Sequence, residues 1–64
     1  MLVFDSLGML VGRVKNVKLV GNKNKLLALV VKRWVLGRVF EIPAIAIEKI
    51  DDNIILRGKM GDYI

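Results

Sequence analysis

Short runs of Val, Ile and Leu separated by turn residues constrain this chain more than any other feature of its sequence. These three residue types supply 25 of the 64 residues, and Val and Ile favour strands. Six glycines separate the runs, at positions 8, 12, 21, 37, 58 and 61. No stretch of helical length keeps a 3.6-residue apolar period with a cap at each end. The pattern therefore predicts an all-β fold, either a barrel or a sandwich.

The same turn residues predict where the strands begin and end. We expect strands at 2–4, 9–20, 26–33, 38–42, 47–50 and 54–57, and the 3-10 turn at 44–46. In the long second strand the apolar residues change parity between Val14 and Val17, so we expect a β-bulge near Lys15 and Asn16. We expect residues 1–64 to form a single domain, with the tail 58–64 either on the barrel or outside it.

Four residues are predicted to shape the turns and the barrel wall. Asp5 opens a four-residue turn, where its carboxylate can accept hydrogen bonds from backbone N–H groups two residues on. Gly8 closes that turn, where a positive φ is tolerated. We expect Gly12 to mark a place where the wall bends or two backbones approach closely, and Pro43 to end its strand because it has no N–H group.

The sequence offers little for catalysis. It contains no cysteine and no histidine, which excludes disulfides and most zinc, copper and haem sites. Ser6 and Tyr63 are the only hydroxyl side chains, and no histidine is present to activate them. Gly8 and Gly12 lack the third glycine and the helix of a dinucleotide-binding motif. We therefore expect a protein that is not an enzyme and that holds no cofactor or metal.

The charge balance leaves two interpretations open. A net charge of +5 can attract nucleic acid or an anionic surface, or it can simply keep a small apolar domain in solution. Binders of single strands stack bases on several aromatic side chains, whereas this chain has four aromatics and only Trp34 is a plausible platform. We do not expect nucleic acid to be the main partner. Uncharged runs are too short to span a membrane and no signal peptide is visible, so we expect a cytoplasmic protein.

The apolar content predicts an interface with another chain. Apolar residues make up 55% of the sequence, more than a domain of this size can bury. The run 26–31 is apolar on both faces, yet a barrel wall has only one inner face. The outward candidates are Leu27, Leu29 and Val31 or, alternatively, Leu26, Ala28 and Val30, alongside Val35, Leu36 or Val39. We expect them to support a homodimer or a heterodimer with a paralogue.

A second interface candidate is a predicted hairpin tip. Its apolar residues are Trp34, Val35 and Leu36, and its cations are Lys32, Arg33 and Arg38. A Trp surrounded by Arg is a common composition of protein-interface hot spots. The alternative is that Trp34 folds back and plugs one end of the barrel.

Several of these residues together resemble the PRC-barrel family. The resemblance rests on Asp5-Ser6-Leu7-Gly8 and Val11-Gly12-Arg13-Val14, on the apolar strand from Leu26 to Val31 after a polar turn, and on Phe40-Glu41-Ile42-Pro43 followed by Ile47 and Ile50. These pieces occur in the family's order and cover most of the chain. Ala44 departs from the pattern, because many members carry an aromatic residue after the proline.

The resemblance implies an all-β fold, a small PRC-type (SH3-like) β-barrel of five or six strands with one 3-10 turn, and a binding module without catalytic activity. The family includes the C-terminal domain of the ribosome maturation factor RimM, the photosynthetic reaction-centre H subunit and small stand-alone archaeal proteins. Among the last are CdpB-type cell-division factors, which act with SepF, the membrane anchor of FtsZ rings. The resemblance therefore implies an archaeal cell-division adaptor at the division site; the alternative is a ribosome-associated or RNA-binding barrel similar to the RimM domain. It assigns no partner-contact residue.

Overall fold

The structure is a computed structural model, and it describes residues 1–21, 25–33 and 37–63. Its elements are β1 (Leu2–Phe4), β2 (Leu10–Val20), β3 (Lys25–Lys32), β4 (Val39–Pro43), η2 (Ala44–Ala46), β5 (Ile47–Ile50), β6 (Ile54–Leu56) and η3 (Met60–Asp62). The η elements are 3-10 turns. The all-β prediction, the six strands and the 3-10 turn at 44–46 are confirmed.

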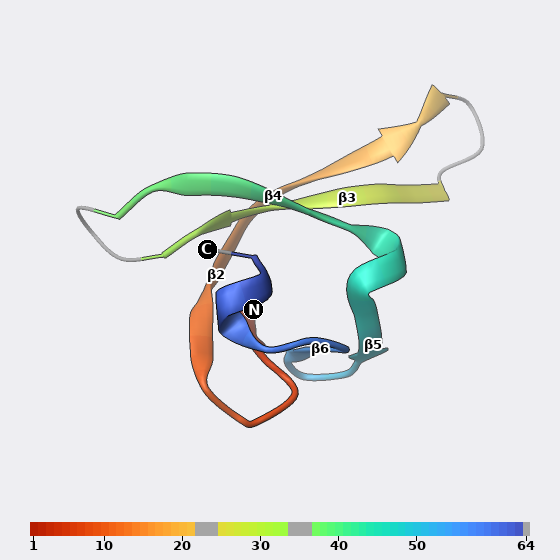
Figure 1. The fold of residues 1–64 in the computed structure, drawn as a ribbon. Helices are drawn as coiled ribbons and strands as arrows, with labels where there is room; N and C mark the ends of the chain where they lie inside the picture. The colour runs from red at the N-terminus through yellow and green to blue at the C-terminus, as the bar shows by residue number, and fades with distance from the viewer. Residues whose placement is uncertain (22–24, 34–36, 64) are drawn as a thin grey trace.

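All six strands belong to one sheet, in the order β4-β3-β2-β1-β6-β5. The β1–β6 pair is parallel and the others are antiparallel. The sheet coils round so that η2 joins the two edge strands β4 and β5 (Figure 1). Within the described residues β4 and β5 are not hydrogen-bonded to each other, so the barrel is not closed.

The long strand β2 carries the predicted bulge. Its register with β3 shifts between Val14 and Asn16, at the position expected from the change of parity. A second shift follows, because Lys18 lies opposite Ala28 while Leu19 lies opposite Leu26, which leaves Leu27 as an extra residue in β3. Bulges increase local twist, and β2 pairs with β1 at one end and with β3 along the rest of its length.

The core lies inside the coiled sheet. Its buried side chains are Val3, Val11, Leu29, Val31, Ile42, Ile47, Ile54 and Leu56. Phe40 and Ile42 share the core side of β4, as the alternation of that strand predicts, and Phe40 is half-buried against the cluster. The core is therefore built from every strand of the sheet, and it holds the two ends of the chain together.

The turn after β1 is organised by a buried carboxylate. Asp5 is 2% exposed. Its Oδ1 accepts hydrogen bonds from the backbone N–H groups of Leu7 (2.9 Å) and Met9 (2.8 Å), and Gly8 adopts a φ of 83°. The predicted turn is confirmed. The other oxygen, Oδ2, accepts a hydrogen bond of 2.7 Å from the N–H of Met60, which ties this turn to the C-terminal tail.

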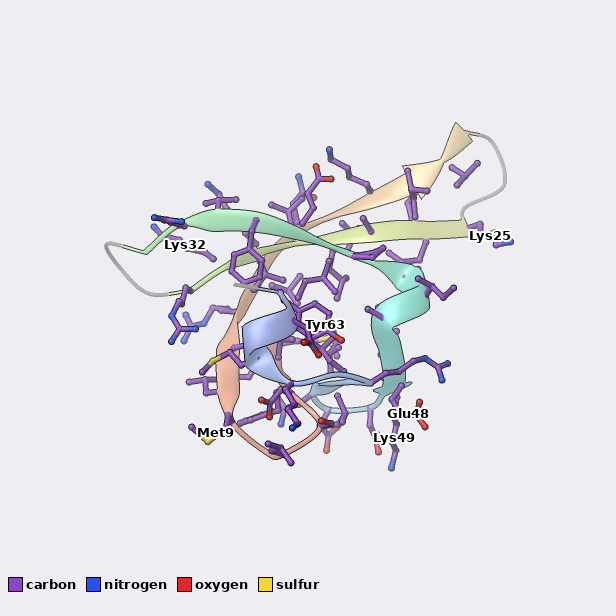
Figure 2. The ribbon with its side chains drawn as sticks, in the orientation of Figure 1. Met9, Lys25, Lys32, Glu48, Lys49 and Tyr63 are labelled. Carbon is purple, nitrogen blue, oxygen red and sulfur yellow. The ribbon has the colours of Figure 1, made fainter. Side chains whose placement is uncertain are left out.

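The tail folds back onto the barrel. The N–H of Gly58 donates to the Tyr63 hydroxyl (2.9 Å), and Met60 and Tyr63 pack against the core cluster. Figure 2 shows Tyr63 near the centre of the molecule. The sequence left open whether the tail 58–64 lies on the barrel or outside it. Because Met60 and Tyr63 pack against the core, the described part of the tail lies on the barrel.

The environment of Asp5 predicts a pH dependence of stability. Burial alone raises the pKa of this carboxyl, but hydrogen bonds from the N–H groups of Met9, Met60 and Leu7 outweigh it and hold the pKa below its ordinary value of 3.8. The unfolded chain therefore takes up this proton first as the pH falls, so protonation favours unfolding. We expect the stabilisation to be complete above the ordinary pKa and lost as the pH falls through the lower, folded-state pKa. Thermal melts between about pH 5 and pH 2 test this prediction. It is wrong if the Tm of Asp5→Asn falls with pH in that range as steeply as the Tm of the wild-type protein.

Candidate binding surfaces

The far ends of β2 and β3 form a hairpin that extends past the rest of the sheet (Figure 1). Directly opposite residues of paired strands point to the same face. Val17 lies opposite the buried Leu29, and Leu19 lies opposite Leu26, which packs against the core cluster. Val17 and Leu19 therefore belong to the core side of the sheet, yet they are 44% and 47% exposed. The core face continues along the hairpin beyond the part that other elements cover.

Two more apolar side chains lie at this end of the sheet. Leu27, the extra residue of the β3 bulge, is 55% exposed. Ile45, on η2, is 82% exposed, and η2 contacts β3. We refer to the side chains of Val17, Leu19, Leu26 and Leu27 as the hairpin surface; Ile45 is a neighbouring apolar side chain on the next element.

The structure corrects part of the predicted interface. Leu29 and Val31 are buried in the core, so the prediction that they contact a partner is wrong. Leu27 and Val39 are exposed and remain candidates. The bulge at Leu27 is the physical reason, because it brings Leu26 to the core side as well as Leu29 and Val31. Neither of the two predicted sets therefore points outward as a whole.

The outer face of β3 is covered in a way that the sequence did not indicate. Ala28 lies opposite Lys18 on β2, and Val30 lies opposite Glu41 on β4. Lys18 and Glu41 form an ion pair, which therefore crosses β3 over Ala28 and Val30. Neighbouring polar side chains thus shelter the outer side of the apolar run of β3 at Ala28 and Val30. Ala28 is accordingly only 7% exposed.

The hairpin tip predicted from the sequence is described only at its two ends. Arg33 is half-buried and Arg38 is exposed, and the backbone N–H of Arg33 donates to the Arg38 carbonyl (3.1 Å). Trp34, Val35 and Leu36 lie outside the described residues.

A depression of about 580 Å³ gathers four cationic side chains on one side of the molecule. Its lining residues are Arg13, Lys15, Lys32 and Arg33, together with Leu2, Leu10, Gly12 and Val14. Leu2 on β1 lies opposite Arg13 on β2, which lies opposite Lys32 on β3, so three neighbouring strands bring these side chains to one face. We call this site the cationic depression. Figure 2 shows Lys32 at the end of β3 that is away from Lys25 and the hairpin.

Among the described residues, no carboxylate forms an ion pair with the cations of the cationic depression. In the described part of the chain the ion pairs join Lys18 to Glu41, Lys49 to Asp51 and Arg57 to Glu48, and none includes a lining residue. Arg33 is held by the tail, because its guanidinium Nη1 donates to the Met60 sulfur at 3.1 Å. Sequence reasoning placed Lys32 and Arg33 at the predicted hairpin tip but did not group them with Arg13. Only the strand register shows that they are neighbours.

No protein-family model matches the chain, and no curated protein is significantly similar to it. Within the residues that the structure describes, no cluster of three or more acidic, histidine or cysteine side chains could hold a metal ion. In the same residues, no helix is long and apolar enough to cross a membrane. The hairpin surface and the cationic depression are therefore the features on which a function can be based.

Proposed function

We propose that this protein is a non-enzymatic protein-binding module that associates with a second copy of itself through the hairpin surface. The observation that carries this proposal is the apolar core face that continues, uncovered, along the hairpin. Val17 and Leu19 are each more than 40% exposed on that face, and Leu27, the extra residue of the β3 bulge next to Leu26, is 55% exposed. Contiguous exposed apolar side chains of this kind typically mark an interaction site.

The adjacent strand edge favours a second copy as the occupant. The pairing of β1 with β2 ends at Arg13, so among the described residues the part of β2 from Asn16 to Val20 pairs with β3 alone. A free edge beside an apolar face can pair with an identical edge. Two antiparallel β2 edges are related by two-fold symmetry, which gives a closed dimer. A heterodimer with a paralogue would use the same surface.

We further propose, on the sequence motifs alone, that the chain is a PRC-barrel and an archaeal cell-division adaptor that acts with a SepF-type protein in the cytoplasm at the division site. The Asp5 turn, the bulged β2 and the Pro43–η2 corner follow one another in the order of those motifs. The alternative, an RNA-binding barrel, would use the cations of the cationic depression. A comparison of the affinities for an acidic peptide and for a single-stranded oligouridylate separates the two functions.

The self-association is tested with Leu27→Ser. We expect the wild-type protein to sediment at micromolar concentration as a dimer of twice 7.2 kDa, and the variant to have a dimer dissociation constant at least about tenfold higher. The folded monomer should be little affected, because Leu27 is more than half exposed. Analytical ultracentrifugation over a concentration series measures both species.

The matched control is Met9→Ser. Met9 is 54% exposed, similar to Leu27, but it lies in the turn before β2, away from the hairpin (Figure 2). We expect this variant to dimerise like the wild-type protein. A wild-type protein that sediments as a 7.2 kDa monomer, or equal weakening by the two substitutions, would overturn the proposal.

A further inference from the structure

We propose that the cationic depression binds an acidic peptide segment. In this segment an apolar side chain lies between carboxylates in the sequence and inserts into the depression. The depression is separate from the hairpin surface, and this proposal does not depend on self-association. Its volume of about 580 Å³ falls within the usual range of pockets that hold a small ligand or a few residues of a peptide.

Charge determines one half of the chemistry that the depression recognises. Arg13, Lys15, Lys32 and Arg33 converge there, and no described carboxylate is within ion-pair distance of any of them. Like charges held together raise the local positive potential, so an anion that binds among them relieves their mutual repulsion. Two or more carboxylates on one segment would complement this arrangement.

Apolar lining residues determine the other half. Leu2, Leu10 and Val14 are half-buried, so part of each side chain remains open to the depression. Gly12, which has no side chain, allows the β2 backbone to approach Lys32 and Arg33 closely and so brings their side chains to the lining. A leucine-sized side chain would bury this apolar surface, whereas a purely hydrophilic anion would make no apolar contact with it.

The same lining argues against nucleic acid as the ligand. Single-stranded nucleic acids bind through stacking of bases on aromatic side chains as well as through phosphate contacts. Among the described residues that line the depression there is no aromatic side chain. Cations combined with aliphatic side chains therefore favour an acidic peptide with an apolar anchor.

Fluorescence anisotropy with a defined probe tests this proposal. The probe is a fluorescein-labelled peptide of sequence Gly-Glu-Glu-Leu-Glu-Glu-Gly, compared with one peptide that has Gln for each Glu and another that has Ser for Leu. A single-stranded oligouridylate of equal charge is the nucleic-acid probe. We expect saturable binding of the acidic leucine peptide, and binding at least about tenfold weaker for the Gln peptide and about fivefold weaker for the Ser peptide.

Matched variants locate the binding site. Lys32→Gln should weaken binding of the acidic peptide about fivefold. If circular dichroism shows that Lys32→Gln folds poorly, Lys15→Gln, at an exposed position, replaces it and should also weaken binding. Lys25→Gln, at the other end of β3, removes the same charge and should change affinity by less than about twofold. Leu27→Ser should leave peptide binding unchanged, which separates this proposal from the self-association.

Four results would overturn the inference. The first is no saturable binding of the acidic leucine peptide up to about millimolar concentration, and the second is an equal loss of its affinity in Lys25→Gln and Lys32→Gln. The third is an affinity for the Ser peptide equal to that for the leucine peptide, and the fourth is tighter binding of the oligouridylate than of the leucine peptide. The second would mean attraction to net charge alone, and the last would favour the RNA-binding alternative. A steep loss of oligouridylate affinity with added salt would identify phosphate contacts as its source.

Discussion

Replacing Asp5 with alanine should lower the Tm of this protein by at least about 10 °C. The carboxylate is buried and accepts hydrogen bonds from three backbone N–H groups, those of Leu7, Met9 and Met60. Alanine leaves these three donors without the acceptor that the buried Asp5 side chain supplies. Hydrogen bonds to a charged group contribute more than neutral ones, and buried donors without a partner are costly. The loss should also release the tail, because Met60 is held to the barrel by Asp5.

Two further variants distinguish these contributions. Asp5→Asn keeps one oxygen for Leu7 and Met9 but places an amide N–H₂ group towards the N–H of Met60, so it should lower Tm by an intermediate amount. Asp52→Asn removes the same charge from the exposed turn between β5 and β6 and should leave Tm almost unchanged. Thermal melts by circular dichroism at neutral pH measure all three. If Asp5→Ala and Asp52→Asn have similar Tm values, the Asp5 hydrogen bonds do not stabilise the fold.

The part of the fold that is local in sequence could be predicted. The Asp5 turn follows from a short acceptor side chain and a glycine at fixed spacing, and the structure shows the expected hydrogen bonds and positive φ. The bulge near Asn16 follows from the change of parity in the apolar residues of one strand. Both signals lie within a few neighbouring residues, where chain geometry leaves few alternatives.

The features that depend on strand register could not be predicted in the same way. Leu27 is an extra residue in β3 only because of how β3 pairs with β2, and this pairing buries Leu29 and Val31. A continuous apolar run has no alternation from which its inner face can be read. The ion pair of Lys18 and Glu41 also joins β2 to β4 across β3, and this order of strands is not encoded in any short segment.

The cationic depression illustrates the same limit at the level of function. Arg13 and Lys32 are 19 residues apart along the chain, and only the β2–β3 register makes them direct neighbours. The sequence indicates an excess of positive charge but not its distribution. The apolar lining of the cationic depression also depends on β1, which places Leu2 beside Arg13. A site assembled from three strands therefore becomes visible only once the sheet order is known.

Replacing Gly12 with alanine should reduce the free energy of unfolding by about 2–3 kcal/mol. A Cβ atom at this position would lie 2.6 Å from the Lys32 carbonyl oxygen and 3.0 Å from the Arg33 Cα, both of which belong to the backbone. Backbone atoms in a paired strand cannot move aside as a flexible side chain can, so β2 and β3 would have to separate. The gain from a less flexible unfolded chain, roughly 0.4–1 kcal/mol for Gly→Ala, is too small to offset this.

Gly61→Ala is the matched control, because a Cβ atom there meets no atom within 4 Å and Gly61 is not among the glycines of positive φ. We expect that variant to be neutral or slightly more stable than the wild-type protein in urea unfolding. Because Gly12 lines the cationic depression, Gly12→Ala should also weaken binding of the acidic peptide, whereas Gly61→Ala should not. Equal stability of the two variants would mean that β2 and β3 can separate at little cost. In that case the close approach at Gly12 would not fix the positions of Arg13 and Lys32.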